Sequence, residues 1–218
     1  MTGVTDELPP IAGYRLVLPP GWVRIPLRHG TDQAIDKALN RAFEGFGRDE
    51  VAKSRRDLDQ RLRVLVDDAR RKEGLDFYLP VVPMHGLPVP ASFLVSEGRF
   101  DTLAEVDAME MVLALAAASD GAEPADLDGS IALRRDSTLP ADPDRGAEFP
   151  SRRVDYTVAP YDDPKRWLVI AFSTMLTDET AELADLLTEL FDAVMTTFRW
   201  QRVAERVARR TVLTESIS

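Results

Sequence analysis

The sequence predicts an α+β fold: an α/β/α sandwich around a central, mainly antiparallel sheet, with a two-helix insertion over residues 31–73. Two observations predict this class. The hydrophobic patterns follow the order β-β-α-α-β-β-α-β-β-β-α, and three successive strands with short links favour antiparallel pairing. The closing block 166–200 joins a strand that is apolar on both faces to a long amphipathic helix, a pattern typical of a mid-sheet strand covered by helices.

The first half of the chain supplies four strands and two helices. Pro and Gly at 19–21 predict a turn, because Pro restricts φ and Gly permits a positive φ. The second helix is densely charged with a narrow apolar stripe, so we expect it to pack on one side only, with Gly74 ending it. In order, the expected elements are strands 14–18 and 22–27, helices 31–46 and 49–72, and strands 75–82 and 91–95.

The second half is predicted to add one buried helix, three strands and the closing helix. A capping box at Thr102 and Glu105 begins the buried helix. Residues 177–179 supply an N-cap and acidic first-turn residues for the closing helix. In order, the expected elements are helix 102–118, an acidic loop 119–129, strand 130–135, a second acidic loop 136–150, strands 153–159 and 167–174, and helix 177–200. We expect one domain over 13–200, with a flexible tail 1–12 and a polar C-terminal extension 201–218.

Composition narrows the function classes. The chain has 218 residues and no cysteine, which excludes thiol catalysis, disulfides and cysteine-ligated metals. Its net charge of −10 argues against nucleic acid and anionic membranes as partners. No stretch is apolar enough to span a bilayer and no secretory signal is visible at the start, so we expect a cytoplasmic protein.

The chain resembles the PsbP-like and Mog-type superfamily, and the actinobacterial LpqN-type proteins within it. The resemblance rests on the early P-P-G-W22, on R-W167-L-V-I-A-F-S-T, and on F-D-A-V-M-T-T-F198-R-W200. It implies an α/β/α sandwich and mostly non-enzymatic roles, such as photosystem assembly and binding of a small GTPase. LpqN-type proteins carry a lipoprotein signal, which the sequence does not show. The resemblance offers no catalytic motif, so it transfers no functional residue.

The residues that could carry chemistry are few. Only two histidines occur, His29 and His85, each next to a glycine in a predicted loop. No nucleophile elbow, metal-binding spacing or phosphate-binding glycine loop is present. We therefore predict no catalytic residue, no metal site and no cofactor, and we favour a protein that is not an enzyme. A hydrolase using His85 or His29 remains an alternative.

The sequence favours a binding function: we expect an accessory or adaptor protein that binds another protein. A secretion or assembly system is one context for such a protein; a small-molecule binder is an alternative, and a second copy of the chain is another candidate partner. Because the apolar residues of block 166–200 are expected to be consumed by the core, we place the site in loops. The candidates are Met84, His85, Leu87, Asp120, Glu123, Asp126, Asp128, Asp142, Asp144 and Glu148.

Overall fold

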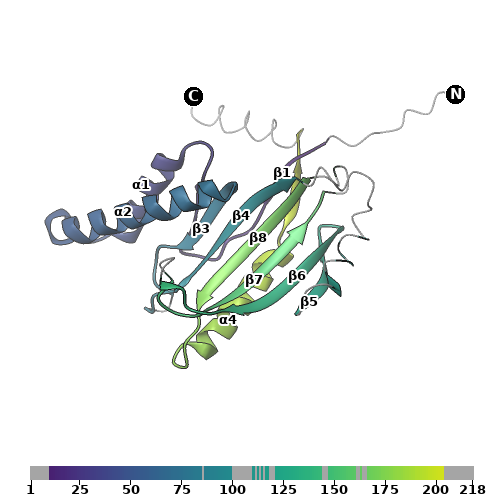
Figure 1. Cartoon of the computed structure of the whole chain (residues 1–218). Coiled ribbons are helices and arrows are strands. Elements are labelled where there is room, and N and C mark those ends of the chain that lie inside the picture. Colours follow the sequence, from purple (N-terminus) through teal and green to yellow (C-terminus); the bar gives the residue numbers. More distant parts are fainter. Residues whose placement is uncertain are drawn as a thin grey trace.

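A computed structural model (Figure 1) describes residues 10–84, 86–99, 110, 112, 114, 116–117, 121–143, 147–160, 163 and 166–203. Its main feature is a seven-stranded antiparallel sheet, which confirms the predicted α+β class and the mainly antiparallel sheet. The strand order is β2 (Trp22–Pro26), β3 (Gly74–Pro80), β4 (Ala91–Arg99), β8 (Arg166–Met175), β7 (Ser151–Val158), β6 (Ser130–Leu139) and β5 (Ala122–Leu127). The strand of the closing block, β8, therefore lies in the middle, as its apolar pattern predicts.

Two strands were missed by the sequence patterns. β5 lies inside the predicted acidic loop 119–129, because its polar and Pro-containing sequence occupies a sheet edge where only one neighbour is needed. β9 (Arg199–Arg202) lies where the closing helix was expected to continue, and it pairs with β1 (Ile11–Arg15) in a separate two-stranded sheet. The predicted turn is present: Trp22 N bonds to Pro19 O at 3.2 Å, and Gly21 has a φ of 86°. The strands on either side of this turn belong to different sheets.

Helix α4 (Ala181–Thr196) covers one face of the sheet (Figure 1). It begins at residue 181 and not at 177, because Thr177 and Thr180 first form a turn in which Thr177 N donates to Thr180 Oγ1 at 2.8 Å. Its apolar stripe packs on β8, where the Phe172 and Phe191 rings stack with centroids 4.7 Å apart. The largest cluster of buried apolar side chains lies on this face, which therefore holds the main core. Each fully buried large apolar side chain stabilises the fold by roughly 1.5–3 kcal/mol.

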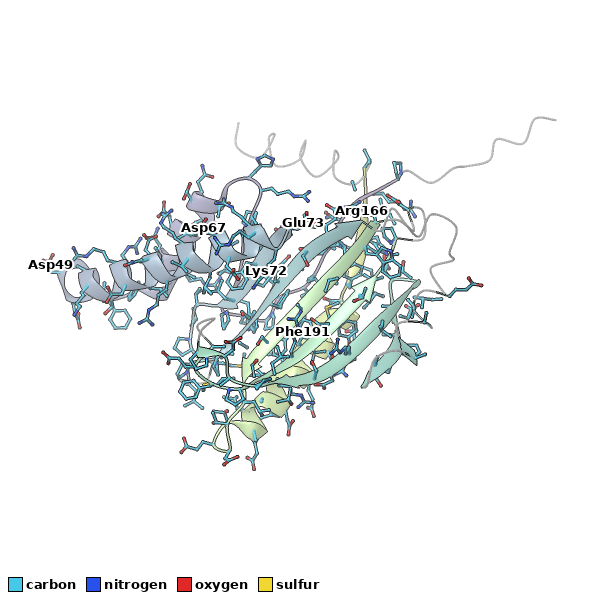
Figure 2. All side chains as sticks on the ribbon, viewed as in Figure 1. Asp49, Asp67, Lys72, Glu73, Arg166 and Phe191 are labelled. Carbon is cyan, nitrogen blue, oxygen red and sulfur yellow. The ribbon has the colours of Figure 1, made fainter. Side chains whose placement is uncertain are left out.

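Helices α1 (Thr31–Ala42) and α2 (Arg48–Arg71) form the predicted two-helix insertion and pack on the opposite face, over β2 and β3. Only the C-terminal half of α2 is buried, so Asp49 lies at the end that projects away from the sheet and Lys72 lies beside it (Figure 2). Glu73, with a φ of 56°, takes the left-handed position after α2 that we expected of Gly74. Gly74 is needed for a different reason: a Cβ there would lie 2.4 Å from Leu27 Cδ1 and 2.7 Å from Ala69 O.

Part of the predicted helix 102–118 is described. Residues 110, 112, 114, 116 and 117 are helical, and Val112 is buried against Trp167 and Leu133 on the α1–α2 face of the sheet. The capping box at Thr102 and Glu105 lies outside the described residues. Across the described part of the chain, every helix is too short or too polar to cross a bilayer.

Candidate functional site

The two loops at one end of the sheet hold several of the predicted site residues. Met84 and Leu87 lie in the β3–β4 loop and pair through backbone bonds of 2.9 and 3.0 Å, with the Leu87 side chain exposed. Asp142 lies in the β6–β7 loop and pairs with Ala147, and Glu148 is exposed beside it. Antiparallel order brings these loops to the same sheet end, whereas His85 and Asp144 lie outside the described residues.

The acidic residues of the β5–β6 hairpin make contacts within the chain. Glu123 forms an ion pair with Arg134 at 3.2 Å, and Asp126 accepts a hydrogen bond from Gly129 N across the turn. Asp128 accepts from Trp200 N at 2.9 Å and thereby anchors the β1–β9 ribbon. The structure thus separates this group from the two loops above, and Asp120 lies outside the described residues.

A hollow of the described surface lies on the sheet face opposite α4, and we call it the sheet groove. Its volume is about 790 Å³. Helix α2 forms one wall through Leu65, Asp68 and Lys72, and strands β4 and β8 form the floor. The two loops described above border its open end, through Val89 and Pro90 on one side and Leu139 and Ala147 on the other.

Strand register arranges the floor of the sheet groove in rows. Ser92 of β4, Ser173 of β8, Arg153 of β7 and Ser137 of β6 are successive partners across the sheet. The adjacent row on the same face begins with Phe77 and runs through Leu94, Ala171, Asp155 and Arg135. The floor therefore mixes serine hydroxyls with apolar side chains at β4 and β8, and it becomes charged toward β7 and β6.

The two faces of β8 differ in their cover, which corrects the expectation that the core would consume all its apolar residues. Leu168, Ile170 and Phe172 are at most 1% exposed under α4. On the other face Trp167 is buried, but Val169, Ala171 and Ser173 are only half-buried and line the sheet groove. The apolar side chains of one face of β8 thus belong to the core, and those of the other face line the sheet groove. The sequence pattern is apolar on both faces and does not distinguish them.

The charged side chains of the sheet groove are paired with one another. Lys72 Nζ lies 2.6 Å from Asp68 Oδ2, and this hydrogen bond holds the pKa of Asp68 below its ordinary value. Arg153 Nε lies 2.8 and 2.9 Å from the two carboxylate oxygens of Asp155. The lining therefore offers apolar contacts, serine hydroxyls and little net charge.

The described histidine and the tyrosines with shifted pKa values lie outside the lining of the sheet groove. None of the described residues that line the sheet groove is a histidine, and His29 is exposed in the loop before α1. Groups of three or more His, Asp or Glu side chains placed to hold a metal are absent from the described residues. The pKa shifts resolved for tyrosines concern Tyr14, Tyr78 and Tyr156, which lie on the α4 side of the sheet.

A buried polar cluster that sequence reasoning missed lies on that α4 side. Asp76 is 2% exposed and accepts from Arg24 Nε at 2.6 Å and from Arg24 Nη2 at 3.0 Å. Tyr14 of the β1–β9 ribbon donates to the same carboxylate and contacts the Tyr78 hydroxyl at 3.1 Å. The Asp76 carboxylate is paired by these contacts. Because Tyr14 comes from β1 and Asp76 from β3, the cluster holds the β1–β9 ribbon to the main sheet. An acidic residue at an inward position of an apolar strand is the one signal that could have revealed it.

The fold and groove define an α+β protein with an open groove on one face of its sheet, in which the charged side chains are paired. No family model matches the chain, and no curated protein matches it. Among solved structures, the mycobacterial LpqN, described as involved in cell envelope biogenesis of Mycobacterium tuberculosis, matches at 11% identity and a TM-score of 0.45 over 87% of this chain and 86% of that one. A Bacteroides thetaiotaomicron protein matches at 10% identity and a TM-score of 0.33 over 53% of this chain and 36% of that one, about a third of its length.

With TM-scores below 0.5, these two matches support no argument about this chain. LpqN belongs to the group that the sequence resembles, but the match assigns the chain neither to that group nor to the PsbP-like superfamily.

Proposed function

We propose that this chain is a non-enzymatic accessory protein that binds a partner protein in the sheet groove. The observation that carries the proposal is the incomplete cover that the described residues give to the second face of β8. Antiparallel sheets often leave one face to solvent, but the side chains on that face are then usually polar. On this face of β8 the apolar side chains of Val169 and Ala171 are only half-buried beyond Trp167. A partner would supply the missing cover.

The rim of the sheet groove favours a protein over a small molecule. Leu65 is 49% exposed and Val64 is 62% exposed on the wall helix α2, and Leu139 is 39% exposed on the opposite side. A second hollow, lined by α2 residues that include Val64, shares Leu65 with the sheet groove. Contiguous exposed apolar surface with a polar rim is a feature of protein-binding sites.

A small apolar molecule is the second candidate, because the volume of about 790 Å³ falls within the range of small-molecule sites. A hydrolase using His29 or His85 has no comparable support from the described residues. The proposal includes a cytoplasmic location and an accessory role in a secretion or assembly system, as the sequence favours.

Affinity capture from an extract of the source cells tests the proposal with two matched variants. Leu65→Glu places a charge on the groove wall, and Leu186→Glu makes the same change on α4, where the side chain is 61% exposed and faces away from the groove. The proposal expects a captured protein that is lost with Leu65→Glu and kept with Leu186→Glu. Its purified form should then bind the wild-type chain in titration calorimetry.

Equal capture by all three forms would place the partner elsewhere. A small-molecule role would instead appear as a rise in melting temperature with an apolar compound, absent in Leu65→Glu, since binding to the native state stabilises it by mass action. A hydrolase would show turnover that is lost on replacing a histidine by alanine.

A further inference from the structure

We infer that the segment of the partner that enters the sheet groove is an amphipathic helix with an uncharged apolar stripe. This inference rests on the proposed function and adds the shape and chemistry of what is bound. Figure 2 shows the neighbouring helix α2, which ends near Lys72 beside the sheet. The bound helix would lie between α2 and the β6–β7 side and complete a helical layer on this face.

Backbone hydrogen bonding is the first reason for a helix. The strands under the groove, β4, β8 and β7, are each paired on both sides, so their backbone N–H and C=O groups are already used. An extended segment lying on this face would bury its own backbone groups without partners, which costs free energy for each group. A helix bonds its backbone internally and needs only side-chain contacts from the sheet.

The sheet edges, where an extended segment could pair, are poorly suited to it. β5 contains Pro124, which lacks an N–H, together with the charged Glu123 and Asp126. β2 is only five residues long, ends at Pro26 and packs against α1. Short, charged and Pro-containing edges are the features that disfavour strand addition.

The opposite face shows how a helix fits this sheet. There α4 presents Leu187, Phe191 and Met195, spaced four residues apart, to the large side chains of β8. In the sheet groove the floor at β4 and β8 combines the small residues Ser92, Ala171 and Ser173 with the aliphatic Leu94 and Val169. The bound helix would fill the space over the small residues with bulky side chains of its own, at the same spacing of three or four residues.

The charges around the groove define the chemistry of the stripe. Asp68 pairs with Lys72 on the α2 side and Arg153 pairs with Asp155 on the β7 side, so the centre places no unpaired charge against the occupant. A charged residue in the stripe would be buried without a partner, which is unfavourable. The stripe is therefore aliphatic or aromatic.

A displayed library of random peptides about 16 residues long, or roughly 24 Å as a helix, tests the inference. It is selected on the immobilised full chain, and the variants are used only afterwards, on the enriched peptides. The expected result is enriched peptides with large apolar residues at i, i+3, i+4 and i+7. A synthetic copy should gain helical circular dichroism on binding. It should bind Leu65→Glu roughly tenfold or more weakly and Leu186→Glu with unchanged affinity.

The helix inference fails if the enriched peptides alternate with a period of two, or if Leu65→Glu binds as well as the wild type. If Leu65→Glu loses capture of the cellular protein but the enriched peptides alternate with a period of two, the proposed function is supported and the helix inference is wrong. No enrichment and no variant-sensitive capture would overturn both. A concentration-dependent dimer that Leu65→Glu abolishes would show that a second copy fills the groove, which also overturns the inference.

Discussion

Tyr14 and Asp76 join the N-terminal strand β1 to the sheet, because the Tyr14 hydroxyl donates a hydrogen bond to a carboxylate that is 2% exposed. Removing this donor leaves a buried charged acceptor with one fewer partner. We expect Tyr14→Phe to reduce the free energy of unfolding by about 1–3 kcal/mol. Urea denaturation followed by circular dichroism measures it. An unchanged midpoint would show that Arg24 alone satisfies the carboxylate.

Alkaline pH should unfold the chain through its buried tyrosines. Burial raises the pKa values of Tyr14, Tyr78 and Tyr156 above the ordinary value of 10.0. Since these pKa values are raised in the folded state, the associated stability is fully present below pH 10 and falls as the pH rises above it. Tyrosinate absorbance during a pH titration should therefore rise together with the loss of circular dichroism. Ionisation of these tyrosines in a fully folded chain would contradict the expectation.

Two neighbouring residues after α2 should respond in opposite ways. Gly74→Ala brings a Cβ to within 2.7 Å of the Ala69 carbonyl oxygen, so we expect a loss of about 1–3 kcal/mol. Glu73→Gly removes a side chain from a residue with a φ of 56°, and we expect a gain of about 0.5–1 kcal/mol. Thermal unfolding of both variants tests the pair. A stabilising Gly74→Ala would mean that the contact relaxes.

The unequal cover of β8 can be tested on adjacent residues. Ile170→Ala creates a cavity under α4, and the expected loss is about 2–5 kcal/mol. Ala171→Val on the groove face adds volume to open space, and the expected change is within about 0.5 kcal/mol. Denaturant midpoints compare the two variants. A comparable loss from Ala171→Val would show that the groove is filled in solution.

Local pattern predicted most of the fold. A run of residues that is apolar on both faces located β8, alternation of apolar residues located β7, and helical spacing located α1, α2 and α4 to within a few residues. It missed β5 and β9, because a short polar strand is recognisable only through its partner. It also extended the closing helix to residue 200, whereas the helix ends at Thr196 and Trp200 pairs with Tyr14 in the ribbon.

The candidate site was less predictable. The loop residues Met84, Leu87 and Asp142 were selected from composition, and the structure places their loops at the open end of the sheet groove. The sequence predicts that the groove-facing residues of β8 belong to the core. The spacing of apolar residues along a strand is the same whether a helix or open space lies over them. Whether a partner protein occupies that space stays a prediction.

The amino-acid sequence by itself determined which segments of this protein form the central strand, the helices and the main turns, because these depend on contacts between residues near in the chain. Only the tertiary structure decided that α4 covers one face of β8, that α2 stops short of covering the other, and that Ser92, Ser173 and Arg153 meet in one row. The physical reason is that strand register, and which sheet face a helix covers, depend on how segments distant in the sequence pack together. A groove forms where the packed segments leave part of a face uncovered, and local sequence patterns do not contain that information.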